Sequence, residues 1–181
     1  MEKAVVTCAL TGILTDRKTY LAPVTPEEMA REARRAADEG ASVVHVHFRR
    51  LEPKLAHMPS WDPKVAAAVV AAIRDACPGI IVNQTTGIVG DDITGPLKCL
   101  KATQPEIGAL NAGSLNYLKT RADGTWAWEP ILFDNPVDKI RKFLQSMCAK
   151  GIESEFECFD LGMVRTAAAI ARNYGYLKPP K

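Results

Sequence analysis

The feature that most constrains the fold is a repeated alternation of short apolar segments with amphipathic helices. Segments rich in apolar or β-branched residues cover 4–10, 42–48, 80–83, 107–111 and 155–159. Residues with helical spacing follow each of them. This alternation is typical of a parallel sheet with helical crossovers. Its spacing leaves open a barrel or an open doubly wound sheet, but no G-x-G-x-x-G motif after the first segment supports a dinucleotide fold.

Local signals set the expected helix boundaries. Thr25, Pro26 and Glu28 form a capping-box pattern, and Gly40 is placed to end that helix. Further helices are expected to begin near Asp62-Pro63, near 94, near Asn135-Pro136 and near 163. The alternation of Trp126 and Trp128 predicts a small hairpin arm, and residues 174–180 resemble the start of a further strand.

Composition narrows the class of protein. The 181 residues carry a net charge of +2, and 47% of them are apolar, so we expect residues 1–181 to form a single globular domain. The near-neutral charge gives no reason to expect nucleic acid or an anionic membrane as a partner. No apolar run approaches the ~20 residues of a membrane span, and no signal peptide is evident, so we expect a cytoplasmic protein.

The sharpest chemical signal is His45-Val46-His47 at the end of the second predicted strand. Alternate residues of a strand point to the same face, so the two imidazoles should project together. In a barrel, the carboxyl ends of the strands carry the active site. Two neutral imidazoles on one face favour a Zn²⁺ site. The alternative is a pair of histidines that form hydrogen bonds within a core.

Polar residues also follow the later strands. Thr85 and Gly87 lie after the third strand and Asn111 ends the fourth, positions that suit a carboxylate or carbonyl ligand but also ordinary turns. Glu155 and Glu157 share one face of the fifth strand. Because an unpaired buried carboxylate is costly, we expect at least one of them in a polar site, unless the strand ends in solvent.

Together these segments resemble the β-keto acid cleavage enzymes, a family that includes the 3-keto-5-aminohexanoate cleavage enzyme. The matching segments occur in family order, and the H-x-H-x-R block is the strongest of them. They are Thr11-Gly12, residues 24–28, residues 40–49, Pro59-Ser60, residues 85–87, residues 110–116, and Glu155-Phe156-Glu157 through Gly162-Met163.

The resemblance implies a zinc-dependent (β/α)8 barrel that converts a β-keto acid and acetyl-CoA into acetoacetate and a new acyl-CoA. His45 and His47 would be metal ligands. Thr85, Gly87 and Asn111 would line the substrate carboxylate site. Glu157 and Arg49 would belong to the same substrate-binding set. The resemblance also favours a homo-oligomer.

Two departures from the family pattern matter. Members that act on the amino-keto acid carry a carboxylate in the loop after the first strand. This chain has Leu14 there, and the absence of the carboxylate favours a neutral or apolar β-keto acid as substrate. The family's third metal ligand and its catalytic arginine and aspartate lie in later strands. We therefore expect the catalytic residues beyond Lys181, and residues 1–181 to supply about five of the eight β/α units, the rest coming from a longer product or another polypeptide.

Two other functions are compatible with the same residues. An amidohydrolase-like metal-dependent hydrolase also uses an H-x-H pair, although there the pair usually lies on the first strand. A non-catalytic fragment would bind metal weakly or not at all.

Overall fold

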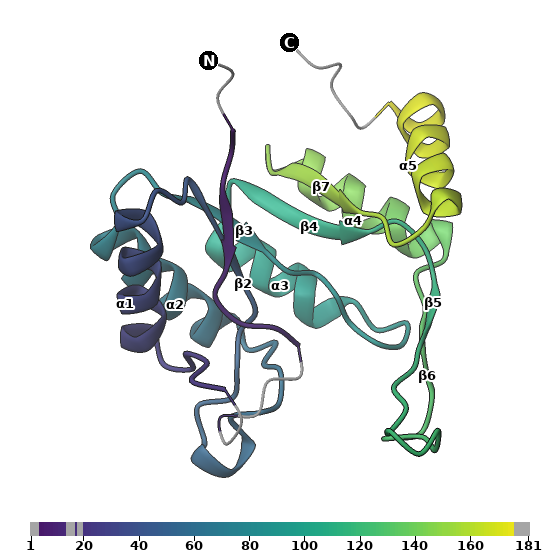
Figure 1. The fold of residues 1–181 in the computed structure, drawn as a ribbon. Helices are drawn as coiled ribbons and strands as arrows, with labels where there is room; N and C mark the ends of the chain where they lie inside the picture. Colours follow the sequence, from purple (N-terminus) through teal and green to yellow (C-terminus); the bar gives the residue numbers. More distant parts are fainter. Residues whose placement is uncertain (1–3, 14–16, 18–19, 176–181) are drawn as a thin grey trace.

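The computed structural model describes residues 4–13, 17 and 20–175. Its centre is a five-stranded parallel sheet with the spatial order β1-β2-β3-β4-β7 (Figure 1). The strands are β1 (Thr7–Ala9), β2 (Val43–Val46), β3 (Ile81–Gln84), β4 (Ile107–Asn111) and β7 (Glu153–Glu157).

The strand order distinguishes the two architectures that the sequence left open. Each strand of this sheet lies beside the strand that precedes it in the chain, apart from an inserted hairpin. A doubly wound sheet instead reverses direction at a switch point. Continuous winding in one direction is the topology of a (β/α)8 barrel. The described residues thus form five consecutive β/α units of such a barrel, as predicted.

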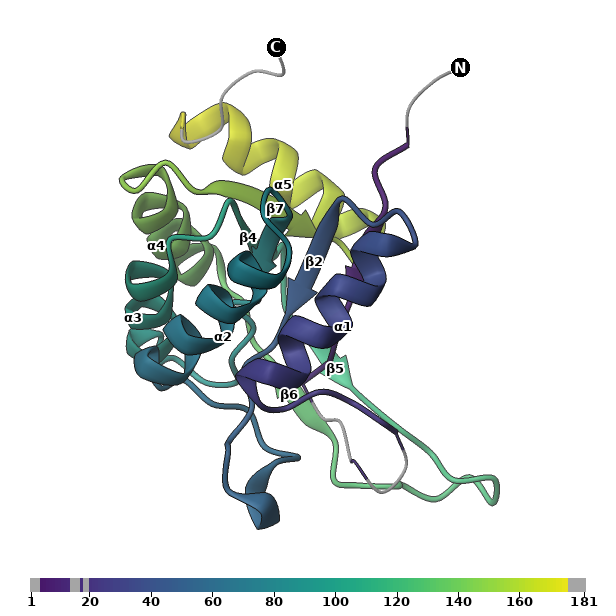
Figure 2. The same ribbon diagram turned by 90° about the vertical axis from the view of Figure 1, so that its left-hand side faces the viewer.

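The helices pack on one face of the sheet, and the first four form successive contacts, the first with the second, the second with the third and the third with the fourth (Figure 2). The outward side chains of the strands, including Val44, Val46 and Leu110, are buried beneath them. The opposite face, which would be the barrel interior, is therefore free to carry polar residues. The helices are α1 (Pro26–Asp38), α2 (Pro63–Ala76), α3 (Thr94–Thr103), α4 (Val137–Cys148) and α5 (Leu161–Tyr174), with a 3-10 turn at Pro53–Leu55.

The start of α1 confirms the predicted capping box. The Thr25 hydroxyl accepts a hydrogen bond from the Glu28 backbone N–H at 3.2 Å, and the Glu28 carboxylate accepts one from the Thr25 backbone N–H at 3.2 Å. Asp62 caps α2 by accepting from the Lys64 backbone N–H at 2.8 Å. These caps satisfy N–H groups that a helix start leaves free.

β4 has the bounds expected from the sequence, and the other four strands of the sheet differ from them. β2 was expected over 42–48 but spans Val43–Val46, and β3 was expected over 80–83 but spans Ile81–Gln84. The first was expected over 4–10 but spans Thr7–Ala9, and the fifth was expected over 155–159 but spans Glu153–Glu157. The bounds of β7 are set by its pairing with β4. Glu153 lies opposite Ile107, so β7 begins where its partner β4 begins, although Glu153 is charged.

A hairpin of two antiparallel strands, β5 (Leu115–Tyr117) and β6 (Ile131–Phe133), follows β4 and extends away from the sheet (Figure 1). The predicted arm is therefore present. Trp126 does not lie in either strand but forms an isolated bridge with Thr120 further along the arm.

Within the part of the chain that the structure describes, no helix is long and apolar enough to cross a membrane. The prediction for Leu14 concerns a position outside the described residues. Of the strand start expected over 174–180, Tyr174 is instead the last residue of α5, Gly175 is its C-cap, and 176–180 lie outside the described residues.

Candidate functional site

The two histidines of the H-x-H motif project from the same face of the sheet. His45 lies in β2 and His47 follows the last residue of that strand, with their ring centroids 4.9 Å apart and their planes at 67°. The intervening Val46 points to the other face and is fully buried. The predicted shared orientation is confirmed.

The environment of His47 favours its neutral imidazole form. Burial lowers the pKa of His47 from 6.5 to about 3, and the positive charges of His45 and Arg49 act in the same direction. At neutral pH the His47 ring is therefore uncharged. Metal ligation requires this form, because a protonated ring nitrogen has no lone pair to donate.

A tetrahedral zinc site normally has three or four protein ligands. The described residues contain no group of three or more histidine, cysteine, aspartate or glutamate side chains able to hold a metal. His45 and His47 fit as two ligands of an ion. A third would have to come from outside the residues that the structure describes.

Asn83 adds an acceptor next to this pair. It lies opposite His45 in the register of β2 and β3, and it is fully buried. Its Nδ2 donates to Glu155 Oε1 at 2.7 Å, whereas its Oδ1 has no hydrogen-bond partner within the described part of the chain. A buried oxygen without a partner costs free energy. Such an atom on the inner face suits a site that gains a further donor or a cation.

Glu157 and Asn111 are polar residues of the same face, further along the sheet on β7 and β4. They lie opposite each other in the register of β4 and β7. Burial raises the pKa of Glu157, and the neighbouring Glu155 adds to this effect, while His45 and the hydrogen bond with Asn111 oppose it. Glu157 thus lies in a polar site, as expected for at least one of the two glutamates on this strand face. Glu155 instead accepts a hydrogen bond from Asn83.

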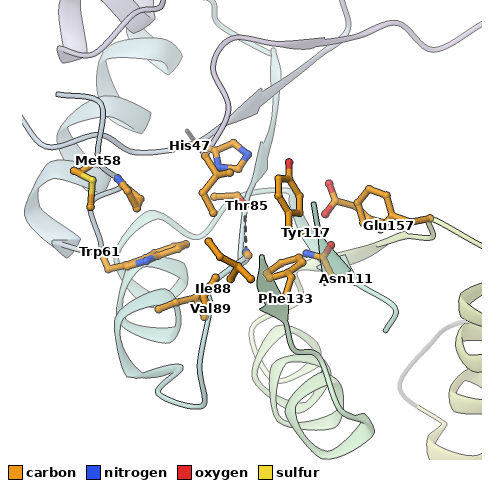
Figure 3. Close-up of a pocket in the computed structure, with 15 residues that line it drawn as sticks. His47, Met58, Trp61, Thr85, Ile88, Val89, Asn111, Tyr117, Phe133 and Glu157 are labelled. Atoms are coloured by element: carbon orange, nitrogen blue, oxygen red, sulfur yellow. Dashed lines mark hydrogen bonds between the residues drawn. The ribbon is translucent and has the colours of Figure 1, made fainter. Parts of the chain in front are cut away.

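His47, Asn111 and Glu157 converge on one cavity of about 520 Å³ at the carboxyl ends of the strands (Figure 3), whereas His45 and Asn83 are not among its lining residues. The cavity volume falls within the range of about 300–1,000 Å³ typical of small-molecule sites. The Thr85 hydroxyl accepts from the Gly87 backbone N–H at 3.2 Å, which leaves the hydroxyl hydrogen available to donate. Of the residues predicted from sequence, those that line the cavity are His47, Thr85, Gly87, Asn111 and Glu157.

Other cavity walls were not predicted from the sequence. They are mainly apolar and come from the loops after β1, β2, β3 and β7 and from the hairpin. The only sequence signal for them is their position after the carboxyl end of a strand. These residues are Ile13, Met58, Pro59, Trp61, Ile88, Val89, Tyr117, Ile131, Phe133 and Phe159.

Arg49 has a different environment from the other predicted substrate residues. It does not line this cavity, and it is 1% exposed. Its guanidinium donates to the backbone carbonyls of Ala56, Gly12, Ile13 and His57. These bonds connect the loop after β1 to the loop after β2. A role in substrate binding remains a prediction, whereas its contacts with both loops are part of the structure.

The comparison with known families identifies the family of this chain. Residues 3–181 match the model of a family described as beta-keto acid cleavage enzyme. The chain belongs to this family. In this chain the H-x-H pair is at the second strand of the sheet, whereas amidohydrolase-like enzymes usually carry such a pair on the first.

Two relatives illustrate the range of this family. The chain is 32% identical to the 3,5-dioxohexanoate:acetyl-CoA acetone transferase of Paraburkholderia graminis and 30% identical to the 3-keto-5-aminohexanoate cleavage enzyme of Fusobacterium nucleatum. Each match covers 99% of this chain and 61% of the relative. The chain therefore spans about three fifths of the length of these family members.

A solved structure supports the fold of the family member described here. The apo structure of ObcA matches with a TM-score of 0.65 at 23% sequence identity. The match covers 87% of this chain and 34% of that chain. At this level of identity the likeness supports the partial-barrel architecture and carries nothing about substrate.

Proposed function

We propose that the protein to which this chain belongs is a zinc-dependent acyltransferase that cleaves a β-keto acid with acetyl-CoA. The products would be acetoacetate and a new acyl-CoA. Family membership supports this reaction class, as do relatives that are named for β-keto acid cleavage or for transfer with acetyl-CoA. Because this chain spans only part of those relatives, the activity is proposed for the whole protein.

The observation that carries the proposal is the convergence of four polar residues from four strand ends on one cavity. His47, Thr85, Asn111 and Glu157 all line it, and His45 lies beside His47. The Thr85 hydroxyl and the Asn111 amide are suited to donate hydrogen bonds to the carboxylate of a β-keto acid. This arrangement would hold the acid with its two oxygen-bearing groups towards the inner face of the sheet.

Zn²⁺ held by His45, His47 and a further ligand would act as a Lewis acid towards the substrate oxygens. In the reaction, the carbon between the carboxylate and the keto group forms a bond to the acetyl carbonyl of acetyl-CoA, and the CoA thiolate leaves. The thiolate then takes the original acyl group, and the old carbon–carbon bond breaks. Atoms balance, because acetoacetate keeps the substrate carboxylate and the acyl-CoA keeps the substituent.

The chain's own residues would orient these groups and manage charge. Glu157 has a raised pKa, so it holds a proton more readily than an ordinary carboxylate. His47 stays neutral at physiological pH, so it adds no positive charge of its own to the site. The base that removes the substrate proton is expected outside the described residues.

Acetoacetate formation tests the proposal. The native protein would be incubated with acetyl-CoA and a panel of β-keto acids, before and after removal of metal with a chelator. We expect acetoacetate to form, to disappear with the chelator and to return with Zn²⁺. His47→Ala should abolish it, whereas His57→Ala should not, because His57 is exposed and outside the cavity lining. Activity that survives both chelation and His47→Ala would contradict the proposal.

A further inference from the structure

The cavity has two chemically different parts. The polar part consists of His47, Thr85, Asn111 and Glu157. Among the described lining residues Glu157 is the only acidic one, and none is lysine or arginine. The remaining walls are formed almost wholly by aliphatic and aromatic side chains.

Part of the apolar lining lies away from Glu157, whereas Tyr117 and Phe133 lie close to Asn111 and Glu157 (Figure 3). In Figure 3, Met58 and Trp61 lie on the opposite side of the cavity from Glu157, with Ile88 and Val89 between them. A β-keto acid whose carboxylate and keto oxygens face the polar part would therefore direct its substituent towards Met58, Trp61, Ile88 and Val89. We name these four residues the apolar wall.

Family membership does not determine the charge of that substituent. One of the two relatives is named for a dioxohexanoate, whose substituent is uncharged, and the other for an aminohexanoate. The apolar lining of this cavity is an observation that does not depend on the names of the relatives. It comes mainly from loops and the hairpin, whereas the polar residues lie at the strand ends.

We propose that the substrate of this site is a β-keto acid with an uncharged, apolar substituent, alkyl or aryl, that packs on the apolar wall. This inference rests on the proposed function and names its substrate class. A carboxylate or ammonium placed against these side chains would lose its hydration without gaining a described partner. Glu157 lies at the other part of the cavity, beside Asn111, where the substrate's own oxygens would lie.

The first test compares three β-keto acids that differ only in the substituent. Acetoacetate, 3-oxohexanoate and 3-oxoadipate would be titrated into the native zinc-loaded protein by calorimetry. Burial of two more methylene groups should make 3-oxohexanoate bind about tenfold more tightly than acetoacetate. The terminal carboxylate should make 3-oxoadipate bind at least about tenfold more weakly than 3-oxohexanoate.

The second test places a charge in the apolar wall. Val89 lines the cavity but is 52% exposed, so Val89→Arg can be accommodated without burying the new guanidinium. We expect this variant to bind 3-oxoadipate about tenfold more tightly than the unmodified protein does, and 3-oxohexanoate more weakly. Val164 in α5 is a matched control, because it is 53% exposed and outside the cavity lining. Val164→Arg should change neither affinity.

The outcomes separate this inference from the proposed function. Equal or tighter binding of 3-oxoadipate than of 3-oxohexanoate by the unmodified protein would overturn the apolar substituent while leaving β-keto acid cleavage intact. An unchanged preference in Val89→Arg would show that the substituent does not reach the apolar wall, and would also overturn the inference. If no β-keto acid binds at all, both proposals fail.

Discussion

Removal of the buried guanidinium of Arg49 should destabilise the fold strongly. The group is 1% exposed and, among the described residues, donates to four backbone carbonyls, at 3.2 Å for Ala56 and 2.6 Å for each of Gly12, Ile13 and His57. Burial lowers the pKa of Arg49, which reflects the cost of removing its charge from water. The four bonds offset that cost.

The magnitude follows from what Arg49→Met would leave behind. Breaking a buried charged network typically costs about 3–5 kcal/mol, and four carbonyl oxygens would lose a charged donor. Domains are typically stable by about 5–15 kcal/mol, so the variant would lose a large share of its stability. Arg49→Lys should lose less, because an ammonium retains the charge and three donors but not the planar fork.

Urea unfolding at pH 7, followed by circular dichroism in metal-free buffer, measures this loss. Arg50 provides a matched control, because it is the next residue and is exposed. Arg50→Met should change the free energy of unfolding by less than about 0.5 kcal/mol. If Arg49→Met has as small an effect on stability and only weakens substrate binding, the structural role assigned to this residue is wrong.

Three further predictions follow from the site. In the metal-free protein, protonation of His47 favours unfolding, because its pKa is about 3 in the folded state and 6.5 ordinarily. The free energy of unfolding should therefore fall as the pH is lowered from about 6.5 towards 3, by up to about 1.4 kcal/mol per pH unit. His47→Gln should reduce this slope in denaturation curves. Asn83→Ala should weaken Zn²⁺ binding about tenfold in a chelator competition, because Asn83 lies opposite His45. Gln84 is equally buried but points to the other face of the sheet, so Gln84→Ala should leave the metal affinity unchanged and only lower the stability of the fold. Gly87→Ala should weaken β-keto acid binding in calorimetry by about tenfold with little change in melting temperature, because its Cβ would lie 3.5 Å from both Asn111 Nδ2 and Thr85 Oγ1; unchanged affinity would remove Gly87 from the site.

Local and periodic signals predicted much of the fold. The alternation of His45, Val46 and His47 correctly indicated two imidazoles on one face and a buried valine on the other. The capping box of Thr25 and Glu28 indicated where α1 begins. These features depend on neighbours within four residues, which is why the sequence alone was sufficient.

Features that depend on distant neighbours were not predicted. The bounds of β7 follow its pairing with β4 and not its own apolar content. Arg49 was placed in the substrate set because it is part of the H-x-H-x-R block, but two of its carbonyl partners lie 36 and 37 residues earlier in the chain. The apolar wall likewise gathers residues from separate loops, such as Trp61 and Val89, that carry no shared sequence pattern.

The central claim is that His45 and His47 bind zinc. A crystal of the native protein measured on both sides of the zinc absorption edge tests it directly. The account predicts an anomalous peak bound by a nitrogen of each ring at about 2.0–2.1 Å. A crystal grown with Zn²⁺ that shows no peak between these two rings would contradict it.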